Sequence, residues 1–311
     1  MSHALAEYVI GIDGGGSETV ALLAHSADGS IIGHGTAGPS NIQSVGVERA
    51  AQALTGAVAA AFAAARLTPG TVAAAALGMA GVDHPDAVAV VRQVAERLKL
   101  ARRIEVVIDA LLLLEAGTPE GWGLAVIAGT GSIDFGRTQD GRFDRSGGWG
   151  YLLGDEGSAY ALGLGGARAV ARASDGCAPP TILTEKVLGF MGLNEPLEMI
   201  DAVYRGPWDR ARLATIAPIV LAAAEAGDAA AGGIVATEAS ELARTAAAAA
   251  RKLGLPADRL PLAVTGGVIL NSLHYRDRFL AAIRALGFEP EPVTPVEEPA
   301  EGAVRIARRL V

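Results

Sequence analysis

Near its start the chain reads Tyr8-Val9-Ile10-Gly11-Ile12-Asp13-Gly14-Gly15-Gly16-Ser17, an apolar run that ends in a glycine turn. A second turn, Gly129-Thr130-Gly131-Ser132, follows the apolar residues 124–128. Each turn lies between two strand-like runs, which predicts a β-hairpin. Glycine permits positive φ and close approach of the backbone to a ligand, and successive N–H groups in such a turn bind anions. Two such loops predict a protein that holds a polyphosphate, as nucleotide-dependent phosphotransferases do.

The same order of elements is predicted in both halves of the chain. The first half has apolar strand patterns at residues 7–13, 20–25, 31–35, 72–79 and 104–108, and helical patterns at 46–66, 86–99 and 110–116. The second has strands at 123–128, 133–137, 142–147, 262–265 and 288–294, and helices starting near residue 157 and at 208–226, 229–253, 272–286 and 300–310. Each half reads β-β-β-α-β-α-β-α, with extra helices inserted in the second. This pattern predicts an α/β fold with two mixed sheets that carry helices on their faces.

The repeat also predicts how the chain divides into lobes. We expect an N-terminal lobe at residues 1–117, joined by the C-terminal helix 299–311. The C-terminal lobe covers residues 118–298 and carries the inserted helices. Ligands of two-lobed proteins usually bind in the cleft between the lobes, so we expect the two glycine loops to face each other across a central cleft. The arginine-rich end, Arg305 to Arg309, is interpreted as a solvated helix face.

The composition excludes several classes of protein. The net charge is −8, whereas nucleic-acid binding proteins normally present a basic face. Cys177 is the only cysteine, so neither an intrachain disulfide nor a four-cysteine metal site can form. We see no signal peptide, and no apolar run reaches the ~20 residues of a membrane span. We therefore expect a cytoplasmic protein without nucleic-acid or membrane partners. A homodimer formed through the inserted helices is a further hypothesis.

Four motifs in order show a family resemblance. Residues 11–19 resemble the first phosphate motif of the actin-like ATPase superfamily, residues 129–132 its second, and residues 264–268 its adenosine motif. More specific is Gly147-Gly148-Trp149-Gly150-Tyr151-Leu152-Leu153-Gly154-Asp155-Glu156-Gly157-Ser158-Ala159. This signature resembles that of the N-acetylglucosamine kinase and glucosamine kinase family, in the activator-ATPase-like branch of the superfamily. The resemblance implies two actin-like (ribonuclease H-like) lobes, ATP as the phosphate donor and Mg²⁺.

Two carboxylates are the candidates for the chemistry. Asp13 lies at a strand end beside the first glycine turn, where it could hold Mg²⁺ through water; a turn carboxylate that caps local N–H groups is the alternative. Asp109 ends a strand and opens a helix. The resemblance makes it the base that orients and deprotonates the sugar hydroxyl, and the alternative is a helix N-cap. Glu18 departs from the Lys that relatives often carry, and we expect it to point away from the phosphates.

The remaining site residues come from the resemblance. The amino sugar is expected to contact Asn41, Gly148, Trp149, Gly150 and Asp155. The alternatives are a turn asparagine at Asn41, a tryptophan that covers the core, and a helix N-cap at Asp155. ATP is expected to contact two groups of residues, which are Gly14, Gly15, Gly16, Ser17, Thr19, Gly129, Thr130 and Gly131 for its phosphates and Ala224, Gly266, Gly267 and Asn271 for its adenosine.

These observations favour an ATP- and Mg²⁺-dependent kinase that phosphorylates N-acetylglucosamine at its 6-hydroxyl. Glucosamine and N-acetylmuramic acid are alternative substrates, because no motif separates an amine from an acetamide at the pocket wall. A hypothesis of another class is an actin-like ATPase switch or a sugar sensor that closes without transferring phosphate. The intact Asp109 argues against that hypothesis.

Overall fold

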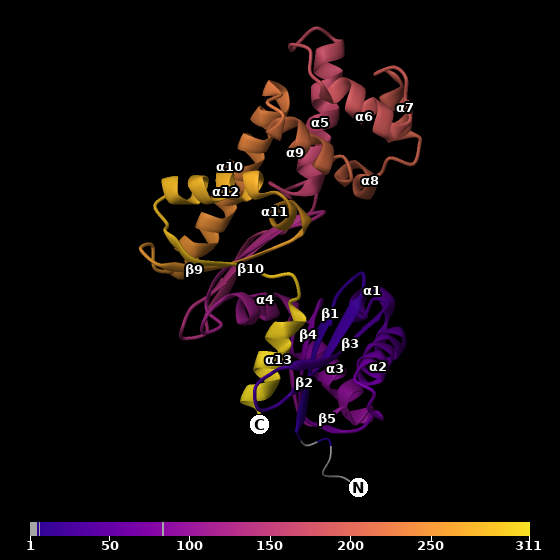
Figure 1. Ribbon diagram of the computed structural model, residues 1–311, viewed down its shortest axis with the longest axis vertical. Helices are drawn as coiled ribbons and strands as arrows, with labels where there is room; N and C mark the ends of the chain where they lie inside the picture. Colours follow the sequence, from indigo (N-terminus) through magenta and orange to yellow (C-terminus); the bar gives the residue numbers. More distant parts are fainter. Residues whose placement is uncertain (1–4, 6, 83) are drawn as a thin grey trace. The chain divides into compact units, whose positions relative to one another are not determined.

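The structure is a computed structural model that describes residues 5, 7–82 and 84–311. The chain divides into two units. Unit 1 comprises the described residues up to Gly121 together with Glu298–Val311, and unit 2 comprises Trp122–Glu297. The predicted α/β fold class is confirmed, because each unit holds one five-stranded sheet with helices packed on it (Figure 1).

In unit 1 the sheet has the order β3-β2-β1-β4-β5, with β1 parallel to β4 and β4 parallel to β5. Its elements are β1 (Tyr8–Gly14), β2 (Thr19–His25), β3 (Ile31–Ala37), α1 (Ile42–Val45), α2 (Val47–Ala64), β4 (Val72–Met79), α3 (Pro85–Arg97), β5 (Ala101–Ile108), α4 (Asp109–Gly117) and α13 (Ala300–Arg309). The last helix of the chain thus belongs to the same unit as the first strand (Figure 1).

Unit 2 repeats this topology with the order β8-β7-β6-β9-β10. Its strands are β6 (Gly123–Ala128), β7 (Ser132–Arg137), β8 (Phe143–Gly147), β9 (Leu260–Thr265) and β10 (Pro290–Pro295). Its helices are α5 (Ala159–Ser174), α6 (Leu183–Met191), α7 (Glu198–Tyr204), α8 (Arg210–Ala214), α9 (Ala217–Glu225), α10 (Ala229–Leu253), α11 (Gly267–Asn271) and α12 (Leu273–Ala285). The strand β10 contains prolines and lies at the sheet edge, where the missing N–H of proline is tolerated.

Small residues let helices approach the first sheet closely. Successive residues of β1 point to opposite faces, so Ile10 packs with α2 and α3 whereas Val9 packs with α4 and α13. A Cβ at Gly11 would lie 2.4 Å from the backbone nitrogen of Val304, and one at Gly35 would lie 2.2 Å from the carbonyl oxygen of Ala57. Glycine on the strands and alanine on the helices therefore allow close packing in a chain of which only 5% is aromatic.

Some predicted elements differ in detail. The helix predicted at 46–66 is confirmed as α2 at 47–64, and the short helix α1, which was not predicted, precedes it. Gly46, with a φ of 79°, separates the two helices. The helix predicted at 208–226 breaks into α8 and α9 between residues 214 and 217. The strand predicted at 104–108 begins three residues earlier, since β5 is an edge strand that can expose Arg102 and Arg103.

Arg305 and Arg309 of the arginine-rich end are exposed, in line with its interpretation as a solvated helix face, but this end is also bonded to the rest of unit 1. Arg305 donates to the carbonyl oxygen of Glu115, and Arg309 forms an ion pair with the Glu115 carboxylate. Arg308 donates to the carbonyl oxygens of Ser26 and Ala27. These bonds attach α13 to α4 and to the β2–β3 turn.

Among the described residues, no single helix is both long and apolar enough to cross a membrane. Two consecutive helical segments, Arg210–Glu225 and Ala229–Leu253, are long and apolar enough for a membrane span only when they are counted together. The chain bends by 115° between them.

The contact between α13 and α4 allows a stability prediction at Gly302. A Cβ there would lie 2.0 Å from the carbonyl oxygen of Leu112, so Gly302→Ala should lower the free energy of unfolding by roughly 1–3 kcal/mol or more. An ordinary helical Gly→Ala change would raise it by up to about 1 kcal/mol. Gly56→Ala in α2 is the matched control, because its Cβ would meet only the Ala37 Cβ at 3.4 Å. Urea denaturation should show shifts of opposite sign, and shifts of the same sign would contradict the packing argument.

Candidate active site

Three parallel strands of unit 1 end at a common edge that gathers the predicted catalytic residues. In the register of the sheet, Gly14 of β1 lies beside Met79 of β4, and Met79 lies beside Ile108 of β5. Asp13 lies near the carboxyl end of β1, and Asp109 directly follows β5, on the other side of β4. The carboxyl ends of parallel strands are where α/β proteins bind ligands. The two carboxyl groups interact electrostatically, because the negative charge of Asp109 raises the pKa of the Asp13 carboxyl.

Asp109 is the first residue of α4 and not its N-cap. The N-cap is Ile108, and no side chain caps this helix. One oxygen of the Asp109 carboxylate accepts a hydrogen bond from the N–H of Ala110 at 2.8 Å. The positive end of the helix dipole favours a carboxylate at this position. The alternative role as an N-cap is therefore wrong, and the carboxylate is held at the sheet edge.

The pKa of Asp13 is raised from 3.8 to about 7, first by burial and then by the negative charges of Asp109, Glu298 and Glu18. Glu18 itself is exposed. A divalent cation would relieve this repulsion, and Mg²⁺ typically takes one or two carboxylates together with water and phosphate oxygens. Among the described residues no group of three His, Cys, Asp or Glu could hold a metal ion. Asp13 supplies a carboxylate oxygen of the kind that Mg²⁺ takes when its other ligands come from water and phosphate.

The first glycine loop closes tightly beside Asp13. The N–H of Gly15 donates to the carbonyl oxygen of Glu18 at 2.9 Å. A Cβ at Gly14 would lie 2.4 Å from the sulfur of Met79, whereas Gly16 and Ser17 are exposed. None of Gly14, Gly15 and Gly16 has positive φ, nor have Gly129 and Gly131 of the second loop. Positive φ is therefore not what requires glycine in these loops, and at Gly14 the reason for glycine is the close approach of the Met79 side chain.

Asn41 is bound to this loop through its backbone. The N–H groups of Ser40 and Asn41 donate to the carbonyl oxygen of Gly15 at 3.1 and 3.2 Å. The Asn41 side chain caps α1 and lies against Gly81, where a Cβ would be 2.8 Å from its oxygen. The predicted sugar contact Asn41 and the strand end at residues 78–81 are thus neighbours. The fully buried Thr19 has its hydroxyl 2.8 Å from the Gly38 carbonyl and from the Ser40 hydroxyl, so this side chain supports the Asn41 loop.

The second glycine loop lies at the N-terminus of α5 in unit 2. The first two N–H groups of that helix, from Ala159 and Tyr160, donate to the carbonyl oxygens of Gly129 and Thr130. The Ser132 hydroxyl donates to the carbonyl oxygen of Glu156 at 2.7 Å. The loop is therefore fixed to the segment that contains the kinase-like signature.

The predicted adenosine motif packs directly on this loop. Gly266 has a φ of 100°, and a Cβ there would lie 2.4 Å from the carbonyl carbon and oxygen of Ala128. Gly267 and Asn271 are the first and last residues of α11. Ala224 lies near the end of α9, and the neighbouring Glu225 accepts a hydrogen bond from the Ser272 hydroxyl at 3.3 Å. The structure thus brings the predicted phosphate and adenosine contacts of unit 2 into one region.

Trp149 of the signature loop is 67% exposed. Gly148 and Gly150 on either side have φ of 69° and 80°, which glycine adopts without strain. The guanidinium of Arg145 lies 5.4 Å from the Trp149 ring centroid. The alternative role of Trp149 as a cover for the core is therefore wrong, because most of its side chain is exposed.

Asp155 was expected to contact the sugar or to cap a helix, but in the structure it is buried and paired with Arg210. The N-cap of α5 is Ser158, whose side chain accepts from the N–H of Ala161, so the N-cap alternative for Asp155 is wrong. Asp155 is only 3% exposed and has a φ of 64°. One of its carboxylate oxygens accepts from the N–H of Ser132 at 3.2 Å, and the other lies 2.8 Å from Nη2 of Arg210.

Sequence reasoning missed three residues that support this region. Arg210 on α8 pairs with Asp155, and Glu238 on α10 accepts from the N–H of Gly157 at 2.9 Å. The buried Tyr275 donates its hydroxyl to the carbonyl oxygen of Gly157 at 2.9 Å. None of them follows a glycine turn or a strand end, which are the local signals that found the other residues.

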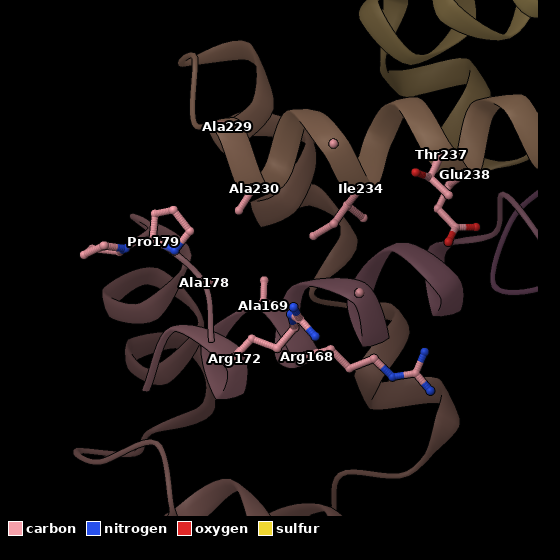
Figure 2. A pocket seen from close by; sticks show the side chains of 13 residues that line it. Arg168, Ala169, Arg172, Ala178, Pro179, Ala229, Ala230, Ile234, Thr237 and Glu238 are labelled. Atoms are coloured by element: carbon pink, nitrogen blue, oxygen red, sulfur yellow. The ribbon is translucent and has the colours of Figure 1, made fainter. Parts of the chain in front are cut away.

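A pocket of about 520 Å³ lies between α5 and α10 (Figure 2). Arg168 and Arg172 line it from α5, and Ile234 and Glu238 line it from α10. Burial raises the pKa of Glu238 above its usual value. None of the site residues predicted from the sequence lines this pocket, although Glu238 connects its wall to Gly157 of the signature.

Two sheets of equivalent strand order, each with a glycine loop between its first two strands, define the class of actin-like ATPase folds. The chain belongs to the BadF/BadG/BcrA/BcrD ATPase family, whose model matches residues 10–307.

Named relatives and solved structures agree with this family. The chain is 32% identical, over 97% of its length and 98% of the relative's, to an N-acetylmuramic acid/N-acetylglucosamine kinase of Clostridium acetobutylicum. It is 33% identical to an N-acetyl-D-glucosamine kinase of Dictyostelium discoideum, over 85% of this chain and 86% of the other. A structure from Chromobacterium violaceum, provisionally named an N-acetylglucosamine kinase, has 31% identity and a TM-score of 0.70, with 96% and 98% of the two chains covered.

Proposed function

We propose that this protein is a sugar kinase that transfers the γ-phosphate of ATP to the 6-hydroxyl of an amino sugar, with N-acetylglucosamine as the first candidate. The observation that carries the proposal is the pair Asp13 and Asp109, which stands beside a glycine loop at the sheet edge of unit 1. Near full-length identity of 32% to a kinase named for two N-acetylated amino sugars supports the substrate class.

The roles follow from the chemistry of each group. Asp109 orients the sugar hydroxyl and accepts its proton, which phosphoryl transfer to an alcohol requires. Asp13 would hold Mg²⁺ through water, and this ion would neutralise charge on the phosphates. Asn41 donates and accepts hydrogen bonds with sugar hydroxyls, and the exposed Trp149 ring packs on the apolar face of the sugar. Backbone N–H groups of the two glycine loops bind the phosphates, and Gly266, Gly267, Asn271 and Ala224 border the adenosine.

N-acetylmuramic acid is the second candidate substrate. The Clostridium relative is named for both this sugar and N-acetylglucosamine, whereas the Dictyostelium relative is named for N-acetylglucosamine alone. Glucosamine remains a weaker candidate, because neither relative's name includes it.

The substrate prediction is tested by ADP release with MgATP and, in turn, N-acetylglucosamine, N-acetylmuramic acid, glucosamine and glucose. We expect an N-acetylated amino sugar to stimulate ADP release strongly, because its hydroxyl is the nucleophile that receives the phosphoryl group. Water is a poor substitute for this hydroxyl. Mass spectrometry of the product should show one added phosphoryl group, and NMR should place it at the 6-position. Omission of Mg²⁺ should abolish turnover. Slow ADP release that none of the four sugars changes would refute the kinase and favour an ATPase switch.

A further inference from the structure

The backbone N–H and C=O of Gly157, near the end of the kinase-like signature, are both bonded to side chains from distant helices. The N–H donates to the carboxylate of Glu238 on α10 at 2.9 Å, and the carbonyl oxygen accepts from the hydroxyl of Tyr275 on α12 at 2.9 Å. These two side chains come from positions 81 and 118 residues further along the chain. We call the three residues the Gly157 clamp.

The clamp leaves no room for a side chain at Gly157. This residue is buried with a φ of 77°, and a Cβ there would lie 2.6 Å from the Leu242 Cβ and 2.7 Å from the Tyr275 oxygen. Burial first, and then the charges of Glu238 and Asp134, raise the pKa of Tyr275 well above its usual value, so its hydroxyl stays protonated and able to donate. Because a buried carbonyl without a partner is costly, the clamp specifies one position for Gly157.

The signature residues before the clamp are the exposed part of this region. The side chains of Trp149, Leu152 and Leu153 are 67%, 79% and 77% exposed. Exposed side chains contribute little packing, so the position of such a segment depends on the points where its ends are attached. Gly157 is the attachment at the end that leads into α5.

The second glycine loop is attached to the same region by other bonds. The N–H of Ala159 donates to the carbonyl oxygen of Gly129 at 2.8 Å, and the Ser132 hydroxyl donates to the carbonyl oxygen of Glu156 at 2.7 Å. Neither bond involves a side chain of the clamp. Loss of a clamp bond should therefore disturb the signature loop more than the phosphate loop.

We propose that Tyr275 and Glu238 are positioning residues for the sugar, which act through Gly157 to hold the signature loop in the conformation that receives it. This role rests on the proposed kinase function, in which Trp149 packs on the sugar. When only a fraction of molecules holds a loop in its binding conformation, the apparent dissociation constant rises by the inverse of that fraction. Loss of a clamp bond should thus weaken sugar binding and leave ATP binding nearly unchanged.

The first test is Tyr275→Phe, which removes one hydroxyl and keeps the buried ring. The KM for N-acetylglucosamine should rise by about 3- to 30-fold, the range for a lost hydrogen bond that leaves a buried carbonyl unpaired, and the KM for MgATP should change by less than about twofold. A merely structural role would lower the folded fraction, and with it the apparent kcat, without raising the KM. Equal rises in the two KM values, or an unchanged sugar KM, would overturn the proposal.

The matched control for this variant is Tyr204→Phe, which removes a hydroxyl from an 83% exposed tyrosine on α7 of the same unit. Both KM values should stay within about twofold of wild type, as for other surface substitutions.

A pair of variants at Glu238 tests the other bond of the clamp. Glu238→Gln keeps an oxygen that can accept from the N–H of Gly157, whereas Glu238→Ala removes it. The sugar KM should stay within about threefold of wild type in the first variant and rise by about tenfold or more in the second. Thr237→Ala changes the neighbouring exposed residue of the same pocket wall and should leave the sugar KM within about twofold. Equal sugar KM values in the two Glu238 variants would contradict a role through this hydrogen bond.

Amide hydrogen exchange without sugar or ATP separates the clamp from the kinase function. In Tyr275→Phe, peptides that cover residues 154–158 should exchange at least about fivefold faster than in wild type, because local opening becomes easier. Peptides that cover residues 129–132 should exchange as in wild type. If a sugar is phosphorylated while the exchange and the sugar KM are unchanged, the proposal fails and the kinase function stands. If none of the four sugars is phosphorylated, the kinase function fails; faster exchange then still shows that the clamp orders the signature loop, and unchanged exchange overturns the clamp as well.

Discussion

Asp109→Asn is expected to lower kcat for sugar phosphorylation by about 10²- to 10⁴-fold, the usual contribution of general acid–base catalysis. Asparagine has the same shape and keeps an oxygen that can accept from the N–H of Ala110, so the start of α4 should be preserved. It cannot accept the proton of the sugar hydroxyl. The KM for the sugar should change by only a few fold, because the amide can still hydrogen-bond to it. Initial rates at saturating MgATP measure the effect.

A matched control for Asp109→Asn is Asp86→Asn, which removes an exposed carboxylate from the first turn of α3 in the same unit. Its kcat should stay within about twofold of wild type, in line with other surface substitutions. Near-normal turnover in Asp109→Asn would refute the role of Asp109 as the base.

The same variant reports on the geometry of the sheet edge. In metal-free protein the pKa of Asp13 is about 7, with burial as the first cause and the charge of Asp109 as the second. Removal of that charge should lower the Asp13 pKa, although burial should still keep it above its usual value. Carbon-13 NMR of the carboxyl groups measures this pKa. An unchanged value would contradict the electrostatic contact between the two side chains.

Gly266→Ala is expected to lower the free energy of unfolding on the order of 3 kcal/mol, because a positive φ and a backbone clash act together. The new Cβ would lie 2.4 Å from the carbonyl of Ala128 and 2.7 Å from the nitrogen of Gly129. Backbone atoms cannot move aside as a flexible side chain can, so the second phosphate loop must shift. The KM for MgATP should therefore rise as well. Thermal denaturation and initial-rate kinetics measure the two effects.

The next residue provides the control for stability. A Cβ at Gly267 would have only the Asn271 side chain within 4 Å, at 3.7 Å. Gly267→Ala should therefore change the free energy of unfolding by no more than about 0.5 kcal/mol. Equal losses in the two variants would show that the close packing of Gly266 on the loop is not what requires glycine there.

Local sequence signals were sufficient for the order of elements and for most of the site. Apolar runs bounded by Asp-Gly and glycine turns predicted strands such as Val72–Met79 and Gly123–Ala128 to the residue. The same signals placed Asp13 and Asp109 at strand ends, because a change from apolar to polar residues marks the point where a strand leaves the core. The family signature at residues 147–159 indicated the substrate class through resemblance.

Only the tertiary structure decided how the charges are arranged. Asp155 and Arg210 are 55 residues apart in the chain. The raised pKa of Asp13 depends on burial, on Asp109 and Glu298 from other segments, and on the nearby Glu18. Helix and strand periodicity carries no information on such pairs, because folding and not local conformation sets which side chains meet. The sequence by itself determined two repeated α/β sheets and a kinase-like set of loops. Tertiary packing determined that Thr19 is bonded to the segment before Asn41 and that Arg210 pairs with Asp155, since these partners meet only in the folded chain.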